Sequence, residues 1–156
     1  PHIWALGDVK GGPQFTYISL DDFRIVRDAL SGKNTRSIND RDPAYAVFMD
    51  PPLARVGLTE EAARAQGRDV RVAVLPAGAV PRARVIDQTE GLLKAVVDAQ
   101  SGAILGCALH CAEAGEMINT VEAAIRAGKD YTFLRDMIFT HPSMTEALND
   151  LFGKIS

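Results

Sequence analysis

The chain has 156 residues, 47% of them hydrophobic, which suffices for one domain or for one domain with a short piece of a neighbour. Its 17 Lys and Arg residues are interspersed among 20 Asp and Glu residues and the net charge is −3, so the sequence lacks the clustered positive charge of a nucleic-acid-binding protein. It contains neither an apolar run of the roughly 18 residues that a membrane helix needs nor the pattern of an N-terminal signal peptide. Its two cysteines cannot form a disulfide framework. We therefore expect a soluble, cytoplasmic protein with neither nucleic acid nor membrane as a partner.

The first segments of the chain predict a short strand and a helix. Residues 3–6 are apolar and are followed by Gly7 and Asp8 and then by a glycine-rich loop. From 15 to 30 the apolar residues fall near helical spacing and a Ser-Gly pair follows at once, so we predict a helix over this range.

Residues 33–42 are polar and charged, which is the composition of a connection between packed units. We therefore predict a domain boundary here, with residues 1–32 in one unit and residues 43–156 in another. Because the sequence starts with Pro1 rather than Met, we expect the chain to be a fragment of a longer protein.

Residues 43–156 contain strand and helix patterns in a mixed order. In chain order we predict a β-rich segment at 44–49, a helix that Thr59 caps and Gly67 ends, a strand at 70–74, a hairpin of strands at 92–97 and 103–109, a helix over 116–128 and a final helix over 144–152. This order, without a repeating βαβ unit, is typical of the α+β class, and we expect an antiparallel β-sheet with helices packed on it.

Gly7 and Asp8 place a carboxylate in a loop where the backbone can approach a ligand closely, and the helix that follows offers free backbone N–H groups. Alone, this pattern is more typical of a simple turn. However, the run IWALGDV that contains both residues resembles the second flavin-binding motif of the pyridine nucleotide-disulfide oxidoreductases. The resemblance implies that Asp8 hydrogen-bonds the ribityl chain of FAD, and that the helix N-terminus, at Gln14, Phe15 and Thr16, points at the pyrimidine edge of the flavin.

The run HPSMTE near the end of the chain is the second candidate site. A neutral imidazole at His141 can accept a proton near pH 7, and Glu146 could bond its other ring nitrogen. By spacing alone, Ser143 or Thr145 could instead cap the last helix, with His141 a surface residue. The run resembles the HPTxSE signature of the same family with the two hydroxyl residue types exchanged. This implies that His141 acts as an acid-base catalyst on the dithiol of the partner subunit, that Glu146 orients it, and that the bond before Pro142 is cis.

The resemblance to this family extends over nearly the whole chain. Residues 50–60 are similar to the entry of its interface domain, and parts of residues 91–118 are similar to its hairpin and following helix. These segments have structural roles, and we attribute Gly57 and Gly106 to turns and close packing and Lys94 to a solvated strand position.

The resemblance implies that residues 1–32 are the C-terminal remnant of an FAD-binding domain, residues 33–42 a linker, and residues 43–156 a dimerisation domain through which the chain forms a homodimer. FAD and NAD(P)H are then the cofactors of the full-length protein. The family's redox-active cysteine pair and nucleotide domains lie upstream, so we expect this fragment to retain no cofactor and to be inactive by itself.

Cys107, His110 and Cys111 form a cluster that suggests zinc or copper binding. Side chains on alternating faces of a strand cannot all converge on one ion, so we predict no metal site and thiols that are partly buried.

The subfamily is indicated by departures from the better-known members. The chain ends FGKIS, without the C-terminal cysteine pair of mercuric reductases or of high-molecular-weight thioredoxin reductases, and Phe139 stands where lipoamide dehydrogenases often carry a second His. Residues 11–22 and 116–119 are most similar to a bacterial subgroup that is related to mercuric reductase and linked with resistance to reactive chlorine.

Two functions follow from the sequence. The first is a part of an oxidoreductase that passes electrons from NAD(P)H through FAD and a dithiol to a disulfide, a metal ion or another oxidised acceptor. The alternative is a stand-alone self-association module without catalytic activity.

Overall fold

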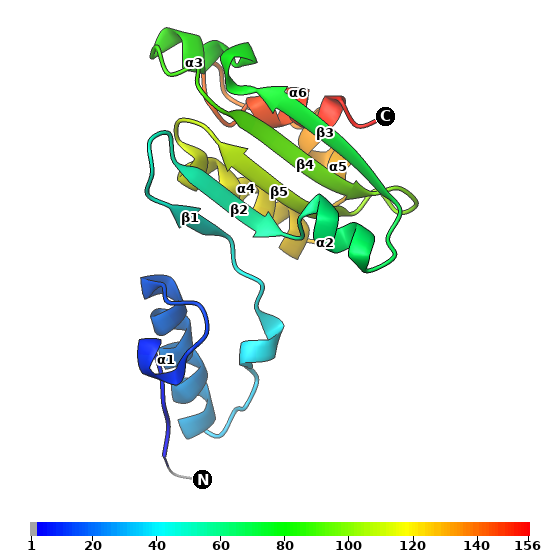
Figure 1. Ribbon diagram of the computed structural model, residues 1–156. Helices are drawn as coiled ribbons and strands as arrows, with labels where there is room; N and C mark the ends of the chain where they lie inside the picture. The colour runs from blue at the N-terminus through cyan, green and yellow to red at the C-terminus, as the bar shows by residue number, and fades with distance from the viewer. Residues whose placement is uncertain (1–2) are drawn as a thin grey trace. The chain divides into compact units, whose positions relative to one another are not determined.

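The computed structural model describes residues 3–156, so Pro1 and His2, at the start of the first predicted unit, lie outside the described residues. The chain divides into two compact units, Pro1–Asp42 and Pro43–Ser156, which are described separately below (Figure 1). No helix in the described part of the chain is long and apolar enough to cross a membrane.

The first unit contains one long helix, α1 (Thr16–Leu30), between two short 3-10 helices, Asp8–Lys10 and Ile38–Asp40. Helix α1 confirms the helix predicted over 15–30, and Gly32 follows it with a φ of 77°, a backbone conformation that glycine adopts without strain. The strand predicted at residues 3–6 is wrong. These residues pair with no strand among those described and their side chains are exposed, because apolar sequence makes a strand only where a neighbour supplies the hydrogen bonds.

The second unit is an antiparallel sheet of five strands with helices packed on it (Figure 1), which confirms the α+β prediction. The spatial order of the strands is β1-β2-β5-β4-β3. Their bounds are β1 Tyr45–Val47, β2 Leu53–Gly57, β3 Val70–Pro76, β4 Leu92–Asp98 and β5 Ile104–His110.

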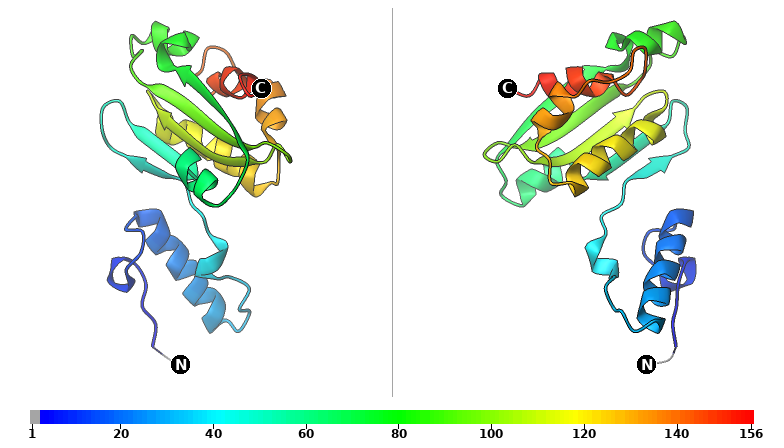
Figure 2. Two further views of the ribbon diagram at one scale, coloured as in Figure 1. Left: turned by 45° about the vertical axis from the view of Figure 1, so that its right-hand side comes forward. Right: turned by 180° about the vertical axis from the view of Figure 1, so that it is seen from behind.

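Helices α4 (Ala114–Arg126), α5 (Tyr131–Asp136) and α6 (Ala147–Gly153) cover one face of this sheet, as the view from behind in Figure 2 shows. Two short helices, α2 (Glu60–Ala65) and α3 (Pro81–Val85), lie in connections at the ends of strands. The core lies between the sheet and the three covering helices. Its side chains alternate along the strands and form a stripe on each long helix, and they include Leu93, Ala95, Val97, Leu109, Met117, Val121, Leu148, Leu151 and Phe152.

Several predicted elements of this unit are confirmed. Strands β4 and β5 form the predicted hairpin, with a shift of register between Val96 and Val97, and α4 carries the predicted apolar stripe. Thr59 caps α2, because its hydroxyl accepts a hydrogen bond from the Ala62 backbone N–H at 2.9 Å. The last helix begins at Ala147 rather than near Met144, because a turn occupies the residues before it.

Gly106 lies where β5 passes close to the backbone that follows β2. A Cβ built at Gly106 would overlap the carbonyl oxygen of Leu58, whose own backbone N–H donates to the Leu105 oxygen at 2.8 Å. Close approach of two backbones therefore explains this glycine, as the sequence predicted.

Gly106→Ala should destabilise the second unit by roughly 1–3 kcal/mol, because a close-packed backbone must move to admit the methyl group. Gly153→Ala is the matched control, since no atom lies within 4 Å of a Cβ built there, and it should be neutral or slightly stabilising. Urea unfolding measures both changes. Equal effects of the two substitutions would contradict the packing explanation.

Candidate functional site

The His141 to Glu146 turn lies directly before helix α6. The chain leaves α5 at Asp136, continues without helix or strand, and enters the turn through a cis bond between His141 and Pro142, which confirms the predicted cis geometry. His141 Nδ1 lies 2.7 Å from Glu146 Oε2. The imidazole is 66% exposed whereas the carboxylate is 18% exposed, so the structure brings the two predicted residues together with the ring on the outside.

The second oxygen of Glu146 has a structural partner. Glu146 Oε1 accepts a hydrogen bond from the Ser143 backbone N–H at 3.2 Å, while Ser143 Oγ accepts one from the Glu146 N–H, also at 3.2 Å. This reciprocal pair is a capping box in the turn that leads into α6. Ser143 Oγ also donates to the Thr140 carbonyl at 2.7 Å, which fixes its rotamer. From the sequence, capping of the last helix and orientation of His141 were alternatives, but the Glu146 carboxylate takes part in both.

This geometry defines what the imidazole can do. With a proton on Nδ1 directed at the Glu146 carboxylate, the neutral ring presents the lone pair of Nε2 as a proton acceptor. No hydrogen bond to Nε2 is found among residues 3–156. Such a pair can act as a general base with an orienting carboxylate on a proton-bearing group that approaches Nε2.

The Gly7 loop of the first unit is held by a buried carboxylate that the sequence did not single out. Gly7 N–H donates to Asp22 Oδ2 at 2.9 Å, and Asp22, only 3% exposed, also pairs with Arg41 at 2.7 Å and Lys10 at 3.4 Å. Arg41 extends this network to Asp21 at 3.0 Å. Burial opposes the charge of Asp22, but the Arg41 guanidinium, the Gly7 amide and Lys10 outweigh it and hold the pKa of this carboxyl below its usual value. The network joins the loop, α1 and the linker.

The candidate cofactor residues lie around this loop and the start of α1. Gly7 has a φ of 73° and lies against Ser19 of α1. Asp8 is exposed, and no side-chain hydrogen bond of Asp8 is found within the described part of the chain. Gln14 is exposed and precedes Phe15, which occupies the N-cap position of α1 without a side-chain cap, and the first turn contains no acidic residue. Thr16 is the first residue of the helix. The positive end of the α1 helix dipole is therefore not neutralised by a carboxylate in the first turn of the helix.

The thiols of Cys107 and Cys111 belong to the core. Both are buried, and burial raises the pKa of each to about 12, with a smaller contribution from Cys111 at Cys107 and from Glu113 at Cys111. Among residues 3–156 no group of three or more His, Cys, Asp or Glu side chains is arranged to hold a metal ion. The two thiols therefore have the environment of packing residues rather than of reactive ones.

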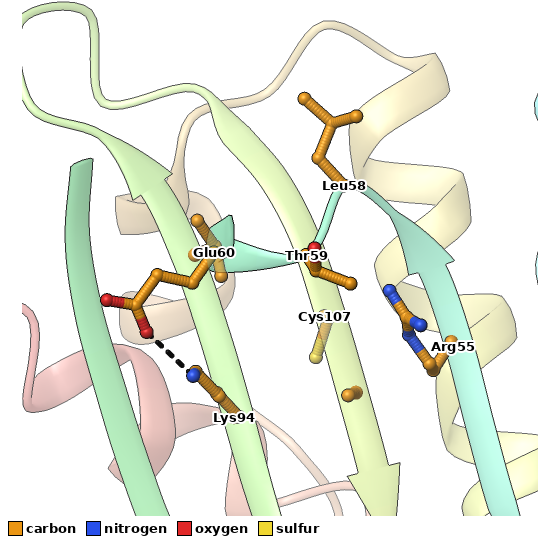
Figure 3. A pocket seen from close by; sticks show the side chains of 8 residues that line it. Arg55, Leu58, Thr59, Glu60, Lys94 and Cys107 are labelled. Atoms are coloured by element: carbon orange, nitrogen blue, oxygen red, sulfur yellow. Dashed lines mark hydrogen bonds and ion pairs between the residues drawn. The ribbon is translucent and has the colours of Figure 1, made fainter. Parts of the chain in front are cut away.

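A pocket of about 260 Å³ lies near the α2 end of the sheet (Figure 3). Its lining residues are Arg55, Leu58, Thr59, Glu60, Lys94, Val96, Cys107 and Ala108. Lys94 and Glu60 form an ion pair at 2.7 Å across its edge, so Lys94 has a structural partner and is not merely solvated. The Lys94 and Arg64 side chains hold the pKa of Glu60 below its usual value. Glu60 thus pairs with both cations, while Arg55 on the other side of the lining donates to the Tyr45 hydroxyl at 3.3 Å.

Comparisons with known proteins concern the chain as a whole rather than its individual site residues. Residues 43–152 match the family model described as "Pyridine nucleotide-disulphide oxidoreductase, dimerisation domain". The chain is 57% identical over 155 residues to the "Probable pyridine nucleotide-disulfide oxidoreductase RclA" of Escherichia coli, and 38% identical over 146 residues to a mercuric reductase of Staphylococcus aureus. These alignments cover 99% and 94% of this chain but 35% and 27% of the relatives, so the chain spans about a third or less of their length.

A solved structure shows the same fold. The "HOCl-induced flavoprotein disulfide reductase RclA from Escherichia coli" superposes with a TM-score of 0.95 at 57% identity, over 98% of this chain and 35% of that one.

Glu146→Ala should release the imidazole and destabilise the start of α6. Loss of the cap should cost about 1 kcal/mol, and the His141 ring should change from a single tautomer to a mixture of two. Nitrogen-15 chemical shifts of the ring and thermal unfolding measure the two effects. Thr145→Ala is the matched control, since no side-chain hydrogen bond of Thr145 is found in the described residues. A His141 tautomer that is unchanged in Glu146→Ala would argue against the orienting role.

Proposed function

The chain belongs to the pyridine nucleotide-disulphide oxidoreductase family and carries its dimerisation domain, and from this premise we propose that it is part of a longer flavoprotein that passes electrons from NAD(P)H to an oxidised acceptor. The observation that carries the proposal is the 2.7 Å pair of His141 and Glu146 with the imidazole exposed. The family is FAD- and NAD(P)H-dependent, and its catalysis needs a proton acceptor next to a dithiol. Neither the family match nor the relatives support the alternative of a stand-alone module.

The domain assignment follows from the same premise. Residues 1–32 are the end of the FAD-binding domain, residues 33–42 the linker and residues 43–156 the dimerisation domain. The compact unit Pro43–Ser156 and the family match over 43–152 support this division. A domain of this family implies self-association, and we propose a homodimer formed through residues 43–156.

The residues of the first unit fit one edge of a flavin site. Asp8 is an exposed carboxylate for which no side-chain hydrogen bond is found among the described residues, and the first turn of α1 contains no acidic residue that would compete with a ligand for the positive end of the helix. We assign Gly7 and Asp8 to the ribityl chain and Gln14, Phe15 and Thr16 to the pyrimidine edge. When bound, FAD would relay the electron pair of NAD(P)H to the dithiol. Asp22 holds the Gly7 backbone and Arg41 holds Asp22, so these two residues keep the loop in place.

His141 acts on the dithiol of the partner subunit. Its Nε2 accepts the proton of one thiol as that sulfur forms a bond to a disulfide acceptor, and the imidazolium then donates this proton to the sulfur that leaves. The second thiol then attacks the enzyme sulfur of this mixed disulfide and breaks its bond to the remaining acceptor sulfur, which leaves with the proton of the second thiol. The disulfide of the pair is restored and two electrons have passed to the acceptor, which is released as two thiols. Glu146 keeps Nδ1 protonated and stabilises the imidazolium while it exists.

The relatives indicate which acceptors to test. The Escherichia coli protein is described as a disulfide reductase, and a second solved structure of it, with a TM-score of 0.95 at 57% identity, is a Cu(II) complex. We therefore propose a disulfide as the acceptor of the full-length protein, with a copper(II) ion as the second candidate.

His141→Ala in the full-length protein should leave reduction of the flavin by NAD(P)H near its normal rate. Transfer from the dithiol to hydroxyethyl disulfide should slow by about 10²–10⁴-fold, because the proton must then come from water. Stopped-flow measurement of each half-reaction separates the two steps. An unchanged second half-reaction would show that His141 is not the acid-base group.

A further inference from the structure

The segment that carries His141 contains few hydrogen bonds of its own. Residues 138–142 take part in no backbone–backbone hydrogen bond found in the described chain, and Ile138 is 96% exposed. Phe139 packs against the core, which holds the segment near its middle. The position of the imidazole therefore depends on what fixes the two ends of this segment.

Helix α6 fixes the later end through Glu146, as described above, and the earlier end through Asn149. Asn149 Nδ2 donates to the carbonyl oxygens of Leu134 at 2.8 Å, Arg135 at 3.0 Å and Met137 at 2.8 Å. Its two N–H groups are thus shared among three acceptors. The carboxamide oxygen could not replace Nδ2 here, because it would face three other oxygens.

These carbonyls need a donor because of how α5 ends. The last carbonyls of a helix have no partner within it, and in α1, α2, α4 and α6 the backbone N–H of the C-cap residue bonds some of them. At Met137, the C-cap of α5, the backbone is extended with a ψ of 142°, and no such bond is found in the described residues. Asn149 supplies the missing donor from another helix.

We propose that Asn149 is a positioning residue for His141. Asn149 lies three residues after Glu146 and so on the same side of α6, and the two side chains fix the start and the end of the His141 segment to one helix. Asn149 thereby sets where the imidazole stands relative to the partner's dithiol. This inference rests on the proposed function, because it concerns the proton transfer assigned there to His141.

The test is Asn149→Asp in the full-length protein, since it keeps the shape of the side chain and replaces the donor with a carboxylate. Asn34→Asp is the matched control: it makes the same change at an exposed residue of the first unit, whose amide makes one long bond of 3.4 Å to the Gly32 carbonyl. Flavin content and thermal unfolding report folding. If the Asp variant does not fold, Asn149→Ala, which removes the donor without adding charge, replaces it in the measurements below.

Two readouts follow the position of the imidazole. Transfer from the dithiol to hydroxyethyl disulfide should slow roughly 10- to 100-fold in Asn149→Asp, with reduction by NAD(P)H little changed, because a displaced catalytic group costs about that much. The pH profile for iodoacetamide alkylation of the reduced dithiol should shift toward that of His141→Ala. Asn34→Asp should match the wild type in both.

A double-mutant cycle with His141→Ala decides between positioning and general stability. If Asn149 acts through His141, Asn149→Asp should have no further effect on either readout in the His141→Ala background. The inference would be overturned if Asn149→Asp slowed the transfer equally in the wild-type and the His141→Ala backgrounds. It would also be overturned if the pH profile for alkylation were that of the wild type in Asn149→Asp but shifted in His141→Ala. If His141→Ala itself changes neither readout, the proposed function fails and this inference fails with it.

Discussion

The two carboxylate oxygens of Glu146 impose the constraint on which the candidate site depends. One oxygen closes the capping box with Ser143 in the turn that leads into α6, while the other holds His141 at 2.7 Å. Because the helix already orders this side chain, orienting the imidazole requires little additional loss of side-chain entropy. The exposed ring is thus held by a group whose own position is set by secondary structure, as a site built on a rigid element requires.

The rest of the dimerisation domain supports that turn. Helix α6 buries Leu148, Leu151 and Phe152 against the sheet, so its first turn is anchored to the core, and α5 packs beside it through Asn149. Buried thiols and the ion pair of Lys94 and Glu60 are features of this scaffold and take no part in the proposed chemistry. In the proposed function each site combines His141 of one subunit with the dithiol of the other, which would explain why a dimerisation domain carries this residue.

The local sequence pattern was sufficient to predict the hairpin, α1, α2 and α4, because their periodicity and caps depend on residues that are near one another in sequence. It was insufficient for β2, which is short, contains Arg55 and is a strand because β1 and β5 flank it. Helices α3 and α5 are too short to show periodicity. His141 and Glu146 were found through a motif, and the structure showed that the capping alternative was part of the same arrangement. Asn149 and Asp22 could not be found, because Asn149 binds backbone carbonyls of another helix and Asp22 binds the Gly7 backbone and the Arg41 side chain, all of them distant in sequence.

The central claim is that His141 serves the dithiol of the other subunit, and hybrid dimers test it most directly. One subunit would carry His141→Ala with an intact cysteine pair, and the other an intact His141 with one cysteine of the pair replaced by serine. Both homodimers should fail to reduce hydroxyethyl disulfide, whereas the hybrid should regain activity at one of its two sites. A hybrid as inactive as the homodimers, with flavin content and dimer assembly unchanged, would contradict the claim that the proton transfer crosses the interface.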